Sequence, residues 1–300
     1  MLRVGVIMGG DSSEREVSLL SGEEFIRHLD QEKYEIIPMI IEKPKEVIEW
    51  VGKIDVALLA LHGRNGEDGK VQALLEALEI PYSGSGVASS AICIDKNMSK
   101  LVMKSMGITT PEWVMVRKDI EWHEEFFTGL KLPLIIKPNQ GGSSIGISIA
   151  ESYLDIEKGI KQALEYDDEV IVEEWIQGEE ITCSMMNGEI IPVLSIKPNM
   201  TFYDYKAKYS MNDHVQQVAH LSQGVIDRLR SLGHQCWQLF KLKNYARIDM
   251  IIQGDVIYVI EINTLPGMTK YSHLPKSARA MGITYKAMLD KIIEASVSSV

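Results

Sequence analysis

The sequence has few of the features that would mark a membrane, secreted or disulfide-rich protein. No apolar run in its 300 residues approaches the roughly 18 residues that a membrane span needs. The only cysteines are Cys93, Cys183 and Cys236, which are scattered and lack metal-ligand spacing. The chain begins with strand-like residues and without the basic and apolar regions of a signal peptide. We therefore expect a soluble, cytoplasmic protein without a membrane partner, whose thiols are buried and unpaired.

Positive charge is also scarce. Lysine and arginine together number 31 against 42 aspartates and glutamates, which gives a formal net charge of -11. Because phosphate backbones attract basic surfaces, we expect no nucleic-acid partner. A few basic side chains that converge locally, helped by a divalent cation, still allow an acidic protein to bind ATP. The charge balance therefore leaves nucleotide-dependent enzymes open.

Hydrophobic periodicity predicts an α/β protein, with some α+β character, in three units. The first unit, 1–94, is a Rossmann-like βαβ unit with strands at 2–8, 35–41 and 55–61 and a helix at 70–79. The second, 95–179, has a helix near 95–106 and strands at 112–116, 133–137 and 169–174. The third, 180–300, has further strands, a polar aromatic loop near 202–210, a helix near 223–242, a hairpin at 246–262 and a last helix from Tyr285.

The predicted hairpin collects polar side chains on one face. Its strands flank a turn at 253–255, so antiparallel pairing places Asp249 opposite Glu261 and Arg247 opposite Asn263. Two facing carboxylates repel each other, so a cation should lie between them. Two carboxylates and one amide suit Mg²⁺. The alternative is a solvated outer face that carries only an Arg–Asp pair.

A glycine-containing loop, Lys137–Gly146, follows the strand PLIIK. Its glycines allow the backbone to approach phosphates closely, while Ser143 and Ser144 supply hydrogen-bond donors. The loop lacks the spacing of a P-loop, and a flexible surface loop remains the alternative.

Two loops of the first unit carry candidate ligand-binding residues. Gly9-Gly10 ends the first strand without the three-glycine dinucleotide fingerprint, which disfavours an NAD-linked oxidoreductase. Ser13 and Glu16 predict a capping box, which leaves Glu14 either to interact with the helix dipole or to bind a ligand amine. The segment 62–69, HGRNGEDG, follows the carboxyl end of a strand, where open α/β sheets bind ligands, although a simple polar turn is the alternative.

Taken together, these motifs resemble the D-alanine:D-alanine ligase family of the ATP-grasp superfamily over nearly the whole chain. The resemblance is carried by GGDSSEREVSL, HGRNGEDG, KPNQGGSSIG, EEWIQGEE, TFYDYKAKY, ARID and EINTLPGMT followed by Ser272. It implies a three-lobed ATP-grasp fold that holds ATP between two sheets. The implied reaction joins two D-alanine molecules through an acylphosphate and releases ADP and phosphate, for peptidoglycan precursor synthesis. A homodimer is also implied.

The resemblance further implies roles for individual residues. ATP binding would involve Lys96, Lys137, Ser144, Glu173, Trp175, Ile176 and Glu180. The ligands of two Mg²⁺ ions, with Mn²⁺ as an alternative, would be Asp249, Glu261 and Asn263. The catalytic set would be Glu14, Ser143 and Tyr209, which anchor the first substrate, and Arg247 and Gly267, which stabilise the oxyanion. Substrate contacts would come from His62, Lys208 and Ser272.

Two alternatives remain open at this stage. An ATP-grasp ligase with another second substrate, D-lactate or D-serine, shares most of these motifs. Tyr209 favours the dipeptide, because the relatives that make D-alanyl-D-lactate carry histidine there. A silent nucleotide-binding module is disfavoured because Arg247, Asp249, Glu261 and Asn263 are all retained.

Overall fold

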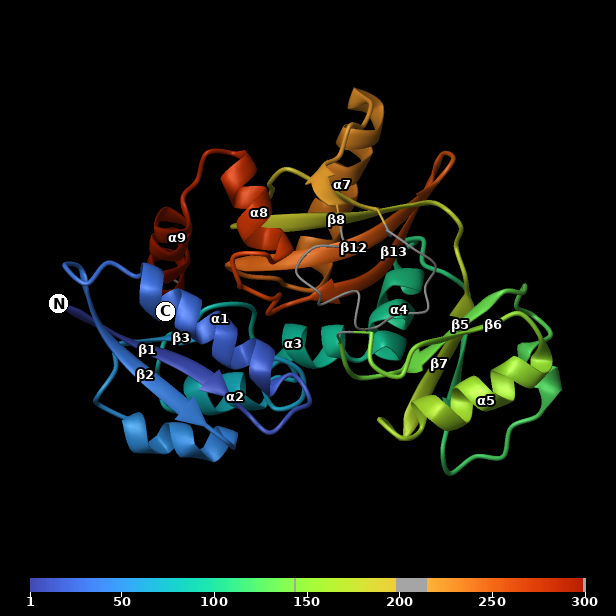
Figure 1. The fold of residues 1–300 in the computed structure, drawn as a ribbon, viewed down its shortest axis with the longest axis horizontal. Coiled ribbons are helices and arrows are strands. Elements are labelled where there is room, and N and C mark those ends of the chain that lie inside the picture. Colours follow the sequence, from blue (N-terminus) through green and yellow to red (C-terminus); the bar gives the residue numbers. More distant parts are fainter. Residues whose placement is uncertain (143, 198–214, 299–300) are drawn as a thin grey trace.

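The computed structural model describes residues 1–142, 144–197 and 215–298. Within these residues the strands form three sheets, as Figure 1 shows. The N-terminal sheet lies at the lower left of that view and the central sheet on the right, while the C-terminal sheet lies above both. The α/β architecture is as the sequence predicts. None of the described helices is long and apolar enough to cross a membrane.

The N-terminal sheet has three parallel strands in the order β2-β1-β3. Its strands are β1 (Leu2–Gly9), β2 (Tyr34–Ile41) and β3 (Val56–Leu59), and the helices of this region are α1 (Arg15–His28), the 3₁₀ helix η1 (Pro44–Trp50) and α2 (Lys70–Ala77). The central strand β1 is buried from Val4 onward, which explains its continuous apolar sequence. β1 ends at Gly9 with φ +100°, where a Cβ atom would lie 2.6 Å from the Ile41 carbonyl oxygen. Glycine is therefore required at this turn.

The capping box predicted at the start of α1 is wrong. The helix begins at Arg15 with Glu14 as its N-cap, and no side chain makes a capping hydrogen bond. Instead, the Ser12 hydroxyl accepts a bond from the Glu14 amide at 3.2 Å and donates to the His62 carbonyl at 2.7 Å. The contact with the neighbouring loop sets the geometry of this turn in place of local capping.

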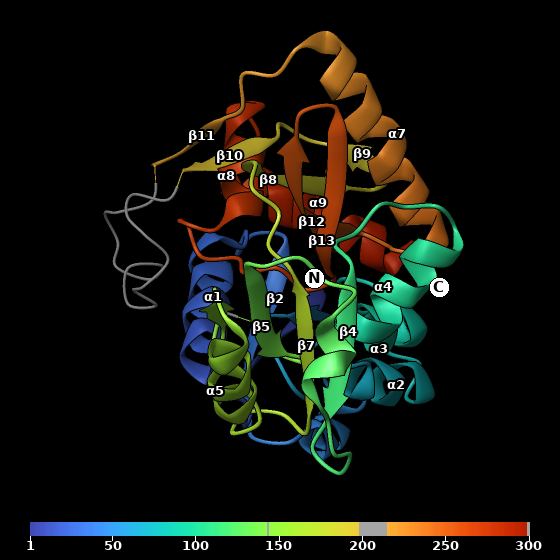
Figure 2. The ribbon, with the colours of Figure 1, turned by 90° about the vertical axis from the view of Figure 1, so that its right-hand side faces the viewer.

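The central sheet is antiparallel, with the order β4-β7-β5-β6. Its strands are β4 (Trp113–Arg117), β5 (Leu134–Pro138), β6 (Ser148–Ala150) and β7 (Glu169–Glu174), with the 3₁₀ helix η2 (Glu124–Phe127) and the helix α5 (Tyr153–Ala163) between them in sequence. Figure 2 shows α5 lying against this sheet. Ile156, Ile160 and Ala163 of α5 are buried, at the 3- and 4-residue spacing of one helix face, and they join Leu134 and Ile136 in one apolar cluster.

The C-terminal sheet runs in the order β11-β10-β8-β12-β13, with β9 paired to β8. Its strands are β8 (Glu179–Met186), β9 (Glu189–Ile190), β10 (Leu194–Lys197), β11 (Val215–Val218), β12 (Tyr245–Gln253) and β13 (Val256–Asn263), and α7 is Gln223–Leu239. Buried apolar residues of this sheet form one cluster, to which the helices α3 (Val87–Ile94) and α4 (Lys96–Ser105) also contribute. Cys93, Cys183 and Cys236 are free, buried members of it, which confirms the expected unpaired thiols.

The last two helices return to the N-terminal sheet. α8 (His273–Ala280) and α9 (Tyr285–Val297) are drawn in red in Figure 1, close to the blue strands. Leu274, Met288 and Ile292 belong to the same apolar cluster as Val4 and Leu58. The chain end therefore completes the core of the first unit. The predicted boundaries at 94/95 and 179/180 remain predictions.

Candidate functional site

The β12–β13 hairpin has the predicted register. Arg247 pairs with Asn263 and Asp249 with Glu261, and the pairing then shifts between Asp249 and Met250. The Arg247 guanidinium lies over Asp249, with Nε 3.0 Å from Oδ1 and the second terminal nitrogen 2.8 Å from Oδ2. It also lies 4.0 Å from Glu261. The hairpin therefore gathers the four polar side chains that strand alternation predicts on one face.

A third strand completes the surroundings of Asp249. Thr182 of β8 pairs with Asp249 in register, and its hydroxyl donates to Asp249 Oδ1 at 2.7 Å. The Asn263 amide nitrogen lies 3.3 Å from Oδ2. The sequence reasoning did not identify Thr182, since only the pairing of β8 with β12 brings it here. The available signal was the alternation of Thr182 and Ser184 with apolar residues in the segment ITCSMM.

The donor atoms at this face fit a hard divalent cation. Asp249 and Glu261 present carboxylate oxygens from facing positions, and Asn263 adds an amide oxygen, which is the ligand type that Mg²⁺ prefers. The side chains of Asp249 and Glu261 are 16% and 28% exposed, so both can reach a ligand from the solvent side. The positive charge of Arg247 partly compensates the negative charge of the two carboxylates. The chemistry of the donor set therefore supports the predicted metal site, whose ligands remain a prediction.

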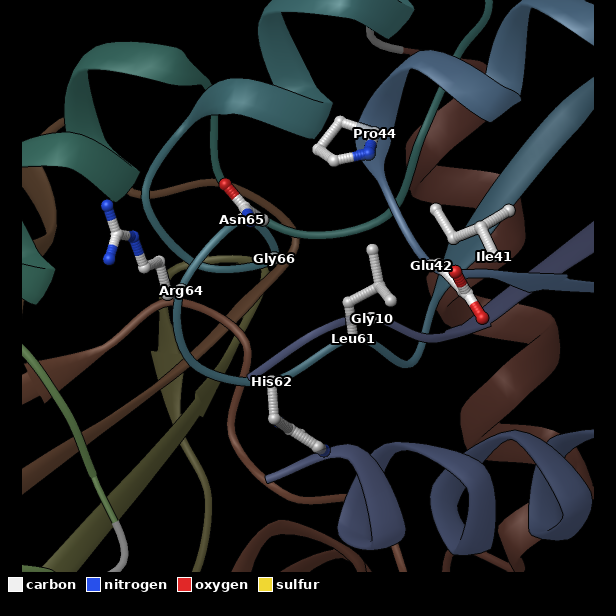
Figure 3. Close-up of a pocket in the computed structure, with 9 residues that line it drawn as sticks. All are labelled: Gly10, Ile41, Glu42, Pro44, Leu61, His62, Arg64, Asn65 and Gly66. Atoms are coloured by element: carbon white, nitrogen blue, oxygen red, sulfur yellow. The ribbon is translucent and has the colours of Figure 1, made fainter. Parts of the chain in front are cut away.

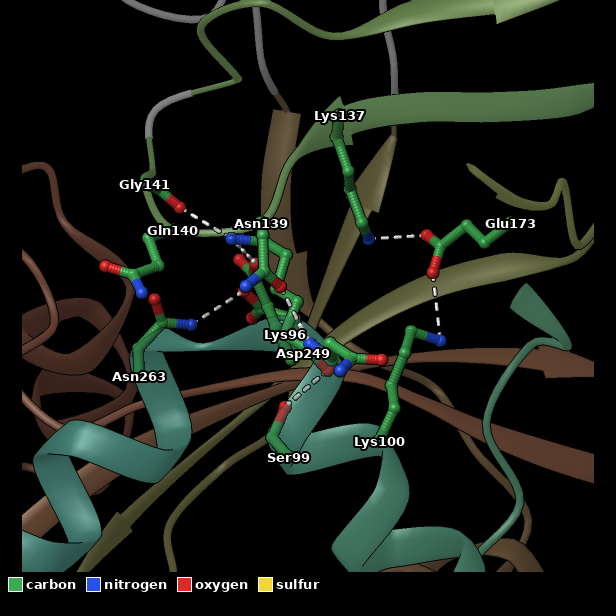
Figure 4. Close-up of polar contacts among 12 residues, drawn as sticks. Lys96, Ser99, Lys100, Lys137, Asn139, Gln140, Gly141, Glu173, Asp249 and Asn263 are labelled. Atoms are coloured by element: carbon green, nitrogen blue, oxygen red, sulfur yellow. Dashed lines mark hydrogen bonds and ion pairs between the residues drawn. The ribbon is translucent and has the colours of Figure 1, made fainter. Parts of the chain in front are cut away.

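The lysine at the start of α4 connects the hairpin with the glycine-containing loop. Lys96 Nζ donates to the carbonyl oxygen of Gly141 at 2.6 Å (Figure 4). It also lies 3.8 Å from Glu261. The Asp95 carboxylate caps α4 at the Met98 amide, 2.9 Å away, and so fixes where Lys96 stands. Burial lowers the pKa of Lys96, and the Glu261 carboxylate opposes that effect. One ammonium group thus reaches both predicted phosphate-binding and metal-binding elements.

A buried carboxylate lies between two lysines on the other side of the site. Glu173 of β7 is 2% exposed, and its Oε1 lies 2.5 Å from Lys137 Nζ at the end of β5. Its Oε2 lies 2.9 Å from Lys100 Nζ of α4 (Figure 4). The distance to Lys100 is that of an ion pair, and Oε2 has no hydrogen-bond partner among the described residues. Lys137 and Glu173 were predicted for nucleotide binding, and Lys100 was not.

The sequence contained a signal that places Lys100 beside Lys96. It lies four residues after Lys96 on a helix, so the two side chains share a face. That face is buried, and its buried residues are Lys96, Ser99, Lys100 and Met103. Burial opposes the charge on Glu173, yet the two lysines hold the pKa of that carboxyl below its usual value. Burial lowers the pKa of Lys100 to about 8.

Glu14 of the first unit reaches the glycine-containing loop of the second. A Cβ atom added at Gly142 would lie 3.2 Å from both carboxylate oxygens of Glu14, and one added at Gly63 would lie 2.9 Å from Oε2. The carboxylate therefore lies against both loops. Ser144 in the same loop has φ +58°, in the left-handed region. The predicted anchor for an ammonium group thus adjoins the predicted phosphate loop, and both roles stay predictions.

His62 is held by contacts on both ring nitrogens. Nε2 lies 3.2 Å from the Ser21 hydroxyl of α1, and Nδ1 lies 3.4 Å from the carboxylate of Glu67. Glu67 also accepts a bond from the Gly63 amide at 2.9 Å. Figure 3 shows a small pocket formed by the ends of β1 and β2 and by the loop around Arg64, with the His62 ring directed toward α1.

The turn after β13 is fixed by residues from two helices. The Met268 amide donates to the Ser21 hydroxyl at 3.4 Å, and the Met268 carbonyl accepts a bond from the Tyr285 hydroxyl of α9. A Cβ atom at Gly267 would lie 3.1 Å from the hydroxyl of Ser272, so these two predicted site residues are neighbours. The sequence reasoning identified neither Ser21 nor Tyr285, because both reach the turn from distant segments.

Family models match almost the whole chain. The model described as D-ala D-ala ligase N-terminus matches residues 3–52 and 45–85, and the model described as D-ala D-ala ligase C-terminus matches residues 102–294. The chain belongs to the D-alanine–D-alanine ligase family. The motifs quoted from the sequence therefore indicated the correct family.

Individual members of the D-alanine–D-alanine ligase family are similar along their full lengths. D-alanine–D-alanine ligases of Bacillus anthracis and Clostridium botulinum are each 45% identical to this chain over 296 residues. The aligned residues make up 99% of this chain, 97% of the Bacillus anthracis ligase and 99% of the Clostridium botulinum ligase. The crystal structure of the Bacillus anthracis ligase complexed with ATP has a TM-score of 0.91 at 42% identity and covers 100% of this chain and 98% of that one. The predicted ATP-grasp fold is thereby confirmed, since the ligase family has this fold.

The remaining residues predicted from the ligase family are placed as follows. Ile176 is buried after β7, and the Trp175 amide donates to the Pro133 carbonyl at 3.1 Å. Glu180 lies at the start of β8, in register with Ile251. Ser143, Lys208 and Tyr209 lie outside the described residues, so their predicted roles stay predictions. So does the choice between D-alanine and D-lactate that was assigned to Tyr209.

Proposed function

We propose that this member of the ligase family joins two D-alanine molecules into D-alanyl-D-alanine with ATP as the energy source, for peptidoglycan precursor synthesis. The observation that carries the proposal is the position of Lys96, which contacts the carbonyl of Gly141 and lies 3.8 Å from Glu261. One cation therefore connects the loop proposed to bind phosphates with the carboxylates proposed to bind metal. Phosphoryl transfer depends on such convergence of charge.

ATP lies, in this proposal, between the central and C-terminal sheets. Lys96, Lys137 and the loop with Ser144 hold the phosphates, and their positive charge offsets that of the triphosphate. The adenine lies toward Glu173 and the segment Trp175–Ile176, where Ile176 is buried beside the strand end. Glu180 is assigned to the ribose. The ATP complex of the Bacillus anthracis ligase supports nucleotide binding at 42% identity.

Asp249, Glu261 and Asn263 are assigned to two magnesium ions, for which manganese is a possible substitute. When bound, these ions would neutralise charge on the transferring phosphoryl group. Glu261 is the more exposed carboxylate of the face, and among the described residues its two nearest cations are 3.8 and 4.0 Å away. It can therefore exchange these weak contacts for a ligand. Asp249 is held more firmly, through Arg247 and Thr182.

In the first step, a carboxylate oxygen of the first D-alanine attacks the γ-phosphorus of ATP. A carbon–oxygen–phosphorus link forms, the bond to ADP breaks and ADP leaves. In the second step, the amine of the second D-alanine attacks the carbonyl carbon and loses a proton, and phosphate departs as the peptide bond forms. The carbonyl oxygen carries negative charge in the tetrahedral intermediate. Arg247 and the Gly267 amide are assigned to stabilise this oxyanion.

The first substrate is proposed to bind between the N-terminal unit and the loop with Gly142. Glu14 faces both sides of this space and anchors the ammonium group, together with Ser143 and Tyr209. His62, oriented by Ser21 and Glu67, lies near the same substrate. Lys208 and Ser272 are assigned to the carboxylate of the second substrate. We further propose that the protein acts in the cytoplasm as a homodimer, without a nucleic-acid or membrane partner.

The experiment combines phosphate release with product analysis. Purified protein is incubated with ATP and Mg²⁺, with and without D-alanine, and products are separated by mass in competition with D-lactate and D-serine. We expect D-alanine-dependent phosphate release with D-alanyl-D-alanine as the main product. A main product containing D-lactate or D-serine would refute the assigned second substrate. Absence of D-alanine-dependent phosphate would refute the ligase activity itself.

A further inference from the structure

Lys100 is fully buried, which is rare for a lysine unless its charge is matched. Its ammonium group lies 2.8 Å from the Thr110 hydroxyl, 3.1 Å from the Pro111 carbonyl and 2.9 Å from Glu173 Oε2. The ammonium group therefore makes two hydrogen bonds and one ion pair with protein oxygens. The ring of Trp113 lies below the charge, 5.1 Å away. These contacts hold the side chain in one place.

The buried group made of Lys100, Glu173 and Lys137 has an excess of one positive charge. Glu173 offers one oxygen to each lysine, at 2.5 Å for Lys137 and 2.9 Å for Lys100. If Glu173 paired with Lys137 alone, the pair would be neutral. A buried excess of positive charge is costly unless an anion compensates it. A nucleotide phosphate beside Lys137 is such an anion.

The position of Lys100 on α4 links this group to the phosphate loop. Lys96 lies one turn earlier on the same helix, and its ammonium group donates to the Gly141 carbonyl at 2.6 Å. One rigid element therefore sets two cations, one toward the loop and one toward Glu173. Figure 4 shows the two lysines of α4 directed to different parts of the site.

We propose that Lys100 is a positioning residue for nucleotide binding: it holds one oxygen of Glu173, fixes that carboxylate, and leaves Lys137 with surplus positive charge for the phosphates. The proposal relies on the nucleotide site described under the proposed function, and does not require ligase turnover. Lys100 acts only through Glu173 and Lys137, because its own ammonium group is enclosed by protein acceptors.

The titration of Lys100 supplies supporting evidence. The charged groups that face it are Glu173 of β7, Lys137 of β5 and Glu112 before β4. Burial lowers the pKa of Lys100 to about 8, and Glu173 partly opposes this effect. A bound polyanion favours the protonated form. Nucleotide binding near pH 8.5 should therefore be accompanied by proton uptake.

The first experiment compares Lys100→Met with Lys104→Met. Lys104 is a matched control on the same helix, 5.5 Å from the same Trp113 ring, but it is exposed and pairs with Glu112. The probe is a non-hydrolysable ATP analogue with Mg²⁺, titrated calorimetrically without D-alanine. We expect Lys100→Met to weaken binding about 10- to 100-fold and Lys104→Met to change it less than about twofold. In turnover assays, the KM for ATP should rise while the KM for D-alanine stays constant.

The second experiment separates positioning from a general loss of structure. Lys100→Met is introduced into the wild type and into Glu173→Gln, and analogue binding is measured for all four proteins. A neutral amide cannot neutralise Lys137, so Lys100→Met should no longer weaken binding in the Glu173→Gln background. An equal loss in both backgrounds would overturn the proposal. So would unchanged binding in Lys100→Met, or an equal loss in Lys104→Met.

The third measurement is proton uptake on analogue binding at pH 8.5, determined in two buffers of different ionisation enthalpy. We expect uptake in the wild type and its loss in Lys100→Met. Uptake that persists in the variant would contradict the proposal. Because all binding measurements omit D-alanine, a wild type that binds the analogue but forms no dipeptide would refute the proposed function while leaving this inference standing.

Discussion

The site contains two carboxylate centres that differ in how they are held. Glu173 is 2% exposed and lies between two buried lysines, whereas the side chains of Asp249 and Glu261 are 16% and 28% exposed and share one guanidinium. The first centre is almost completely buried in the protein. The second is partly accessible to solvent. We call Glu173 with Lys100 and Lys137 the fixed centre, and Asp249 with Glu261 the exchangeable centre, because we propose that ligands replace the contacts of the second during the reaction.

The physical basis of this difference is the cost of leaving a charge without a partner. Removing one member of a buried ion pair typically destabilises a protein by about 3–5 kcal/mol, whereas half-exposed pairs contribute about 0–1 kcal/mol. Glu173 therefore belongs to the part of the site that folding requires. Glu261, whose nearest cations in the described part of the chain lie at 3.8 and 4.0 Å, belongs to the part that we propose is available to a ligand.

The largest expected effect is that of Glu173→Ala on stability. The substitution leaves Lys100 and Lys137 buried without their carboxylate, so the free energy of unfolding should fall by about 3–5 kcal/mol. Glu261→Ala, at the exchangeable centre, should lower it by less than about 1 kcal/mol. Chemical denaturation monitored by circular dichroism measures both. Equal losses for the two variants would contradict the distinction between the centres.

Arg247→Ala should act mainly on turnover. Loss of one oxyanion-stabilising donor typically lowers kcat by about 10²- to 10³-fold, and the affinity for ATP should stay largely intact. Arg228→Ala is the control, because Arg228 is an exposed arginine that bonds to the Asp255 carbonyl near the far end of the hairpin. Steady-state kinetics with separate nucleotide titrations measures both variants. Wild-type activity in Arg247→Ala would refute the oxyanion assignment.

The exchangeable centre was easier to predict from sequence than the fixed one. Strand alternation and one turn set the register of Asp249 and Glu261, because both lie on neighbouring strands of a single hairpin. Thr182 reaches the site only through the pairing of β8 with β12, and Lys100 only through the ion pair that joins α4 to β7. Local periodicity contains no information on such contacts between distant segments.

The prediction for the start of α1 failed for the same reason. Ser13 and Glu16 have the spacing of a capping box, but Ser12 bonds to the His62 carbonyl and the helix starts one residue later than a Ser13 cap requires. The docking of α8 and α9 onto the N-terminal core was likewise not predicted. Their apolar faces indicate burial, yet they do not say against which sheet.

A pH series tests the fixed centre by itself, through the titration of Lys100. The pKa of Lys100 is lowered from 10.5 to about 8, so between these values the unfolded chain binds more protons than the folded one. In this window the contribution of Lys100 to the free energy of unfolding rises with pH, by at most about 1.4 kcal/mol per pH unit. Below pH 8 the contribution is constant.

Comparison of the wild type with Lys100→Met isolates this contribution, because other titrating groups are common to both. Chemical denaturation at pH 7.5 and 9.5 gives the two slopes. We expect the stability of the wild type to rise relative to that of Lys100→Met over this interval. Parallel curves would show that Lys100 does not titrate in the window.

The smallest expected effect concerns a hydrogen bond that supports the turn after β13, next to the exchangeable centre. The Tyr285 hydroxyl donates to the Met268 carbonyl, while the Met268 amide bonds to Ser21, so this peptide is held from both sides. Burial raises the pKa of Tyr285, which keeps the phenol neutral and able to donate. The adjacent Gly267 amide is the proposed oxyanion donor, and its direction depends on the same turn.

Tyr285→Phe should therefore lower kcat by about 2- to 10-fold, as expected for loss of a hydrogen bond of about 0.5–1.5 kcal/mol, without changing the affinity for ATP. Tyr271→Phe is the matched control, since Tyr271 is exposed on the same turn. A fall in nucleotide affinity with constant kcat would instead show that α9 acts on the nucleotide side. An unchanged kcat would show that the turn after β13 keeps its geometry without this contact, and that the exchangeable centre is independent of the helices behind it.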